Sequence, residues 1–181
     1  RLGAFQWDLP PALHSDNFVG GMANWWLNTK PVKKPLFLQI GFPGPHPPYD
    51  PTPDILAKYL KKTDIPMPVI GQDELENLPP PLKVKRNHDA EVDHDSILWP
   101  LDANDNQIKH MRAHYMANVE MIDLQIGKIM DTLQTKGYLD NAIVIFTTDH
   151  GDCLGDHGLT QKWSMYEEVV HVPLIINSQG R

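Results

Sequence analysis

The chain has 181 residues and a formal net charge of −7, with 41% hydrophobic and 22% charged residues. This length suffices for one domain with a sizeable core, and the composition is typical of a globular protein. An acidic chain without a basic stripe argues against nucleic acid as a partner, and no apolar run is long enough to predict a membrane span. The single cysteine, Cys153, excludes an internal disulfide and a cysteine-based metal cluster.

The first predicted element is a short helix over residues 16–30, which we expect to be interrupted at Gly20-Gly21. Ser15 or Asp16 would serve as its N-cap, because both side chains can accept a hydrogen bond from the first turn.

The apolar run 34–42 predicts a buried strand, since it is short and a Gly/Pro cluster follows it. Prolines exclude regular structure from 44–53, and 54–62 predict another short helix. Residues 63–100, called the excursion below, are polar and rich in proline, which predicts an ordered but irregular insertion or lid. We expect three apolar residues to anchor it: Ile97, Leu98 and Trp99.

The clearest helix is predicted over residues 105–136. Apolar residues recur there every three or four positions, as on one face of an α-helix. They are Ile108, Met111, Tyr115, Val119, Ile122, Ile126, Ile129 and Leu133. Asp102 or Asn104 would cap its start, and Gly137 stands where a left-handed residue ends many helices.

Two further strands are predicted at 141–150 and 169–177, the first with Val144, Ile145 and Phe146 buried on both faces. Helices alternating with strands indicate an α/β layered fold with a mostly parallel sheet. Ligands of such sheets bind beyond the carboxyl ends of the strands. We therefore expect the loops 43–50 and 149–163, which follow predicted strands, to meet at one site.

Asp149 and His150 begin the second of these loops, and a turn at Gly151 would let both side chains converge. A carboxylate and an imidazole form half of a metal site. The alternative is a helix-capping aspartate beside a surface histidine, and spacing alone leaves both readings open. For Asp152, Asp156 and His157 we favour structural roles.

Three stretches together resemble the sulfatase family of the alkaline-phosphatase-like superfamily. They are KPLFLQIGFPGPHPPYDP, the helix and strand from HYMANVEM to TTDHG, and FTTDHGDCLGDHGLTQKWSMYEEVVHVPLII. The resemblance implies a three-layer α/β/α sandwich with a mostly parallel central sheet, incomplete in this chain. Residues 1–181 would form part of a single sulfatase-like catalytic domain.

The resemblance also implies roles for individual residues. Asp149 and His150 match the pair that binds the family's divalent cation, with Ca²⁺ favoured and Mn²⁺ as the alternative. Lys162 matches the catalytic, substrate-binding lysine that contacts the sulfate or phosphate group. His46 matches the catalytic histidine on the leaving-group side, where it would also bind substrate.

The family's nucleophile is a formylglycine made from a C/S-x-P/A-x-R motif, and no such motif occurs in these 181 residues. Cys153 stands in a different context, and the family's early paired aspartates and C-terminal subdomain are also missing. We therefore expect a central fragment of a longer enzyme, inactive by itself, with the nucleophile segment outside this chain.

The leading hypothesis is a sulfuric ester hydrolase that acts on a sulfated small molecule or glycan. A phosphonate monoester or phosphodiester hydrolase of the same superfamily is the first alternative, and a noncatalytic sulfatase-like module is the second. A periplasmic or secreted location is favoured over a cytoplasmic one, and the oligomeric state stays open.

Overall fold

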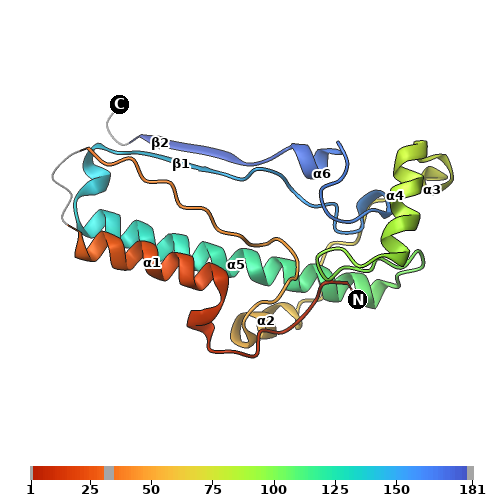
Figure 1. Cartoon of the computed structure of the whole chain (residues 1–181), viewed down its shortest axis with the longest axis horizontal. Helices are drawn as coiled ribbons and strands as arrows, with labels where there is room; N and C mark the ends of the chain where they lie inside the picture. The colour runs from red at the N-terminus through yellow and green to blue at the C-terminus, as the bar shows by residue number, and fades with distance from the viewer. Residues whose placement is uncertain (1, 31–34, 179–181) are drawn as a thin grey trace.

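The computed structural model describes residues 2–30 and 35–178, and its longest element is α5 (Asp105–Thr135) (Figure 1). Asn104 and Gln107 form a reciprocal capping box at its start. Gly137 follows its end with a φ of 74°. The predicted helix, its cap and its C-terminal glycine are thus confirmed.

The buried face of α5 differs from the predicted apolar stripe. Helices α1 (Ser15–Thr29) and α2 (Pro53–Tyr59) pack against α5. Ala117 and Met121, which lie outside the stripe, pack on α2, whereas Val119 is 45% exposed. The neighbouring helices therefore select which face is buried, and that face includes polar residues: Arg112, His114, Asn118 and Gln125.

Helix α1 follows a single 3-10 turn, η1 (Pro11–Leu13), and runs unbroken through Gly20-Gly21. The predicted interruption is wrong because Gly20 serves close packing on α5. A Cβ atom there would lie 2.6 Å from the Gln125 side chain. The predicted N-cap is also wrong, because His14 caps the helix through its ring nitrogen.

The strand predicted at 34–42 is not formed over the described residues 35–42, and Lys34 lies outside the described residues. A strand requires a neighbouring backbone to accept and donate its hydrogen bonds, and no described segment pairs with this one. Phe37 is accordingly 91% exposed.

The excursion is more regular than predicted. It contains α3 (Glu74–Asn77) and α4 (Pro80–Glu91). Prolines 80 and 81 occupy the first turn of α4, where a missing N–H costs nothing, so they start a helix rather than prevent one. The predicted anchor is confirmed for Ile97 and Trp99, which are buried against Tyr49, while Leu98 is half-buried.

Strands β1 (Ile143–Thr147) and β2 (Leu174–Ser178) form a two-stranded antiparallel ribbon, with Ile145 opposite Ile176. The described residues include no parallel pair of strands. Ile145 is 61% and Phe146 40% exposed, so the predicted burial on both faces is wrong: no described element covers the ribbon. Among the described helices, none has the length and apolar character needed to cross a membrane.

Candidate active site

Asp149 and His150 stand two and three residues beyond the end of β1, at the start of loop 149–163. Asp149 Oδ2 lies 3.7 Å from His150 Nε2. The turn that follows depends on Gly151, because a Cβ atom there would overlap the backbone carbonyl of Glu168. The turn at a glycine thus lets the two side chains converge, as the sequence predicts.

The hydrogen bonding of His150 leaves one ring nitrogen available to a ligand. Its Nδ1 atom lies 2.7 Å from the carbonyl oxygen of Gly151. Because a carbonyl oxygen only accepts, Nδ1 must carry the proton. In the neutral ring, Nε2 then keeps its lone pair and faces Asp149.

The Asp149 carboxylate is largely exposed and ionised at neutral pH. Partial burial raises its pKa, but its own backbone N–H, the His150 ring and the His150 backbone N–H together lower that pKa below 3.8. An ionised oxygen and a free imidazole nitrogen suit a divalent cation. Two such ligands leave most of its coordination shell open.

Asp152 joins the two loops that were expected to meet. Its Oδ1 accepts hydrogen bonds from the backbone N–H groups of Leu154 and Gln161, both at 2.9 Å. Its Oδ2 accepts the hydroxyl proton of Tyr49, a fully buried residue of loop 43–50, at 2.7 Å. Burial and the Asp152 charge raise the pKa of Tyr49 well above 10, so the hydroxyl remains a donor.

His46 lies on loop 43–50, which a buried side chain of α1 contacts. Asp16, 1% exposed, accepts the N–H of Gly44 at 2.9 Å. His46 Nδ1 lies 2.8 Å from the carbonyl oxygen of Pro47 and therefore carries a proton. Its Nε2 lies 3.8 Å from Oδ2 of Asp95, which is in the turn between His94 and Ile97 of the excursion.

Lys162 is half-buried and has no hydrogen-bond or ion-pair partner within residues 2–30 and 35–178. Its position follows from Gln161, which has a φ of 62° and donates its side-chain N–H to the His94 carbonyl at 3.0 Å. His94 adjoins Asp95, so one turn of the excursion contacts both site loops.

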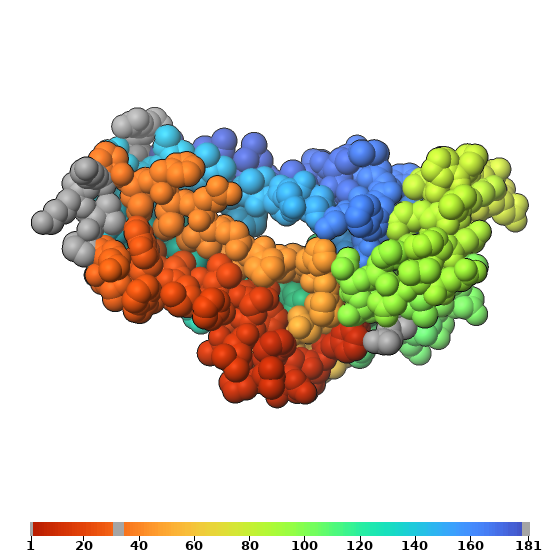
Figure 2. Space-filling model, viewed as in Figure 1, coloured from red at the N-terminus to blue at the C-terminus, as the bar shows by residue number. Residues whose placement is uncertain are grey.

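The structure brings some predicted site residues together and leaves others apart. Asp149 and His150 form a pair, whereas no hydrogen bond or ion pair among the described residues connects that pair to His46 or Lys162. Figure 2 shows the molecule hollowed between the segment with loop 43–50 (orange) and the segment with β1 and its following loop (cyan to blue). The four side chains thus belong to two loops, 43–50 and 149–163.

Cys153 is unsuited to be a nucleophile. It is 1% exposed, and its Sγ lies 3.4 Å from the hydroxyl oxygen of Ser164. Burial raises the pKa of the thiol to about 11, so the reactive thiolate is scarce at neutral pH.

Arg112 is a buried residue of α5 that the sequence pattern did not single out. It holds loop 149–163, called the site loop below, to the excursion. Its guanidinium donates to the carbonyl oxygens of Leu154 and Pro66, each at 3.0 Å, and to Asp156 Oδ2 at 2.8 Å. Its place beside the predicted apolar stripe could have indicated this role, because a charged side chain that is buried requires hydrogen-bond partners. Asp156 has the structural role predicted for it.

Replacing Arg112 by methionine should destabilise the protein by about 3 kcal/mol, because it leaves a partly buried carboxylate and two carbonyl oxygens without their donor. Urea unfolding of the full-length protein, followed by tryptophan fluorescence, measures this loss. Lys128→Met, on the exposed side of the same helix, is the matched control and should change stability little. Equal stability of the two variants would contradict the role of Arg112 in holding the site loop to the excursion.

His157 connects the site loop to two carboxylates, Glu74 Oε1 at 2.6 Å and Glu168 Oε2 at 3.1 Å. Partial burial lowers its pKa, but hydrogen bonds and charge from these carboxylates outweigh that effect, so the pKa is raised above 6.5. A raised pKa means that protonated His157 stabilises the folded state fully below pH 6.5. This stabilisation is lost as the pH rises through the raised value.

His157→Gln should therefore lower the Tm more in acidic than in alkaline buffer. Thermal unfolding of wild type and variant across this range measures the difference between their Tm values. A difference that grows with pH would contradict the assignment.

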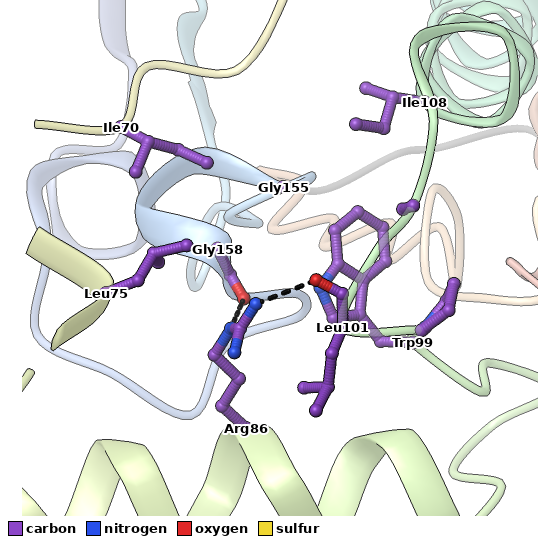
Figure 3. Close-up of a pocket in the computed structure, with 10 residues that line it drawn as sticks. Ile70, Leu75, Arg86, Trp99, Leu101, Ile108, Gly155 and Gly158 are labelled. Atoms are coloured by element: carbon purple, nitrogen blue, oxygen red, sulfur yellow. Dashed lines mark hydrogen bonds between the residues drawn. The ribbon is translucent and has the colours of Figure 1, made fainter.

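A small pocket lies between the excursion and the site loop (Figure 3). Ile70, Leu75 and Trp99 supply apolar walls from the excursion. Arg86 crosses it, donating to the carbonyl oxygens of Gly158 at 3.2 Å and Leu101 at 3.0 Å. The excursion thus supplies half of the residues that line the pocket.

Comparison with known proteins adds independent findings. The sulfatase family model matches residues 5–181. An arylsulfatase of Clostridium perfringens is 32% identical over 178 residues, which cover 96% of this chain and 34% of the relative. Human (Homo sapiens) iduronate 2-sulfatase is 30% identical over 159 residues, covering 84% of this chain and 28% of the relative. The chain therefore spans about a third of the length of these curated relatives.

Among solved structures, the phosphonate monoester hydrolase of Agrobacterium radiobacter superposes with a TM-score of 0.82 at 24% identity. The match covers 97% of this chain and 35% of that one. This likeness confirms the predicted fold class, although the described residues include only a two-stranded ribbon of its sheet.

Proposed function

Because this chain belongs to the sulfatase family, we propose that the full-length protein is a metal-dependent sulfuric ester hydrolase. The observation that carries the proposal is the pair at the end of β1. Asp149 Oδ2 and His150 Nε2, the ring nitrogen that does not contact the Gly151 carbonyl, lie 3.7 Å apart. A carboxylate oxygen and an imidazole nitrogen are both ligands of divalent cations.

The donor set fits a divalent ion, which sulfatases generally use. Ca²⁺ is the proposed ion on the family resemblance, although an imidazole ligand also suits Mn²⁺. When bound, the ion would supply positive charge beside the oxygens of the sulfate group. Asp149 is mostly exposed, which leaves room for further oxygen ligands.

Lys162 is the proposed anion contact. Its ammonium has no partner among the described residues, so it can approach a sulfate oxygen without breaking an existing interaction. A compact positive charge there stabilises the negative charge that develops as the ester bond breaks.

His46 is the proposed leaving-group residue. Its Nδ1–H is held by Pro47, so the proton offered to a departing oxygen would sit on Nε2 of the doubly protonated ring. Asp95 Oδ2 lies 3.8 Å from that nitrogen. The nucleophile is proposed to be a formylglycine, by family resemblance alone.

A phosphonate monoester or phosphodiester hydrolase is the second candidate. It is favoured by the likeness to the Agrobacterium radiobacter structure, and both reactions present anionic oxygens to the same groups. The proposed substrate is a sulfated small molecule or glycan.

Turnover of an aryl sulfate and of the matched aryl phosphonate monoester by the full-length protein tests the proposal. We expect a higher kcat/KM for the sulfate. A higher kcat/KM for the phosphonate would select the second candidate, and turnover of neither would support a noncatalytic module.

A further inference from the structure

Apart from the residues considered above, one cluster of metal-binding side chains occurs in the part of the chain that the structure describes. It lies on the excursion, where His88 and Asp89 are in the last turn of α4 and His94 follows the helix. One donor atom from each residue lies within 4.8 Å of the others. This inference does not depend on the proposed activity.

The two histidines already have the spacing that a shared ion requires. His94 Nε2 lies 3.3 Å from His88 Nδ1, and the two rings stack with centroids 5.0 Å apart. Two nitrogens bound to one tetrahedral Zn²⁺ at about 2.0–2.1 Å are about 3.3 Å from each other. The same spacing also fits an N–H···N hydrogen bond between the two rings. The third residue therefore decides between a shared metal ion and that hydrogen bond.

That third residue, Asp89, has a buried oxygen without a partner. The residue is 5% exposed. Its Oδ2 accepts from Lys85 Nζ at 2.6 Å, whereas Oδ1 accepts no hydrogen bond from any described residue. Oδ1 lies 3.9 Å from His88 Nδ1. A buried carboxylate oxygen is costly to leave without a donor or a cation, and a metal ion beside the histidines would meet that need.

We propose that His88, Asp89 and His94 bind a second divalent ion of the zinc class. Two imidazoles and one carboxylate oxygen favour Zn²⁺ over Ca²⁺, and a water molecule would complete a tetrahedral shell. Lys85 neutralises the other Asp89 oxygen, so the carboxylate binds through Oδ1 alone. The ion is distinct from the one proposed at Asp149 and His150.

The ion would fasten the turn that contacts both site loops. His94 and Ile97 exchange two backbone hydrogen bonds across this turn, at 2.8 and 2.9 Å. The His94 carbonyl accepts from Gln161, and the adjacent Asp95 faces His46. Joining His94 to the end of α4 would therefore restrain a segment that borders the candidate active site.

The test is calorimetric titration of Zn²⁺ into chelator-treated full-length protein. An Asp149→Ala background removes the contribution of the other proposed metal site. We expect one zinc equivalent that His88→Ala and His94→Ala each weaken at least about tenfold, because each removes a direct ligand. Ca²⁺ should not compete for this equivalent.

His171→Ala is the matched control, since the His171 side chain is 80% exposed and pairs with the exposed Glu167. It should bind zinc as the background protein does. Circular dichroism checks that each variant is folded, and both tested histidines are exposed enough to be replaced without disturbing a core. Unchanged zinc affinity in both histidine variants, or no zinc equivalent in the background protein, would overturn the proposal.

Discussion

Asp149→Ala is expected to reduce kcat/KM for sulfate ester hydrolysis at least about a hundredfold, because it would remove a direct ligand of the proposed metal ion. The Asp149 side chain is 86% exposed, so its loss should leave the folded state almost unchanged. Its lowered pKa keeps it ionised throughout the neutral range, so the loss should be similar at every pH tested there. Steady-state kinetics and elemental analysis of the same sample measure both effects.

Asp131→Ala is the control for this substitution, since Asp131 is an exposed carboxylate on α5, away from both loops. It should retain wild-type kinetics and metal content. Full activity in Asp149→Ala would remove the metal role from this residue, whatever the family resemblance implies.

The second large effect is expected for Asp152→Ala. Asp152 accepts three hydrogen bonds, and the change leaves the buried Tyr49 hydroxyl and the backbone N–H groups of Leu154 and Gln161 without an acceptor. We expect a loss of about 3 kcal/mol or more in the free energy of unfolding. Turnover should fall as well, because the lost bond to the Gln161 N–H holds the backbone next to Lys162, the proposed anion contact.

Tyr49→Phe separates the two functions of Asp152. It removes only the bond between the loops, which should cost about 1–3 kcal/mol, and leaves the two backbone bonds within loop 149–163 intact. We expect a smaller fall in Tm and a rise in KM larger than the fall in kcat, because loop 43–50 carries His46. Urea unfolding and steady-state kinetics test both, and equal stability of Asp152→Ala and wild type would contradict the linking role.

The parts of the fold that were predicted well depend on local signals. Helix α5 has a sustained apolar period, a capping box at Asn104 and a glycine just after its end, all within one stretch of chain. The prediction of a strand at 34–42 was wrong because an apolar run indicates burial but does not identify a neighbouring strand to pair with. Helix α4 was missed because three prolines read as breakers, although a proline in the first turn is compatible with a helix.

In the candidate site, too, the features with a local sequence signal could be predicted and those that depend on distant residues could not. Asp149 and His150 could be recognised because they closely follow a strand, and their convergence needs only the turn at Gly151. The hydrogen bond between Tyr49 and Asp152 joins residues 103 positions apart, and no local sequence pattern predicts it. The roles of His46 and Lys162 come from the family resemblance and remain predictions.

The most direct test of the account is metal dependence of the full-length protein. Chelator-treated protein should lose turnover of an aryl sulfate, and Ca²⁺ or Mn²⁺ should restore it in wild type but not in Asp149→Ala. Turnover that survives chelation, in protein shown by elemental analysis to hold no divalent metal, would contradict the central claim that Asp149 and His150 hold a catalytic cation.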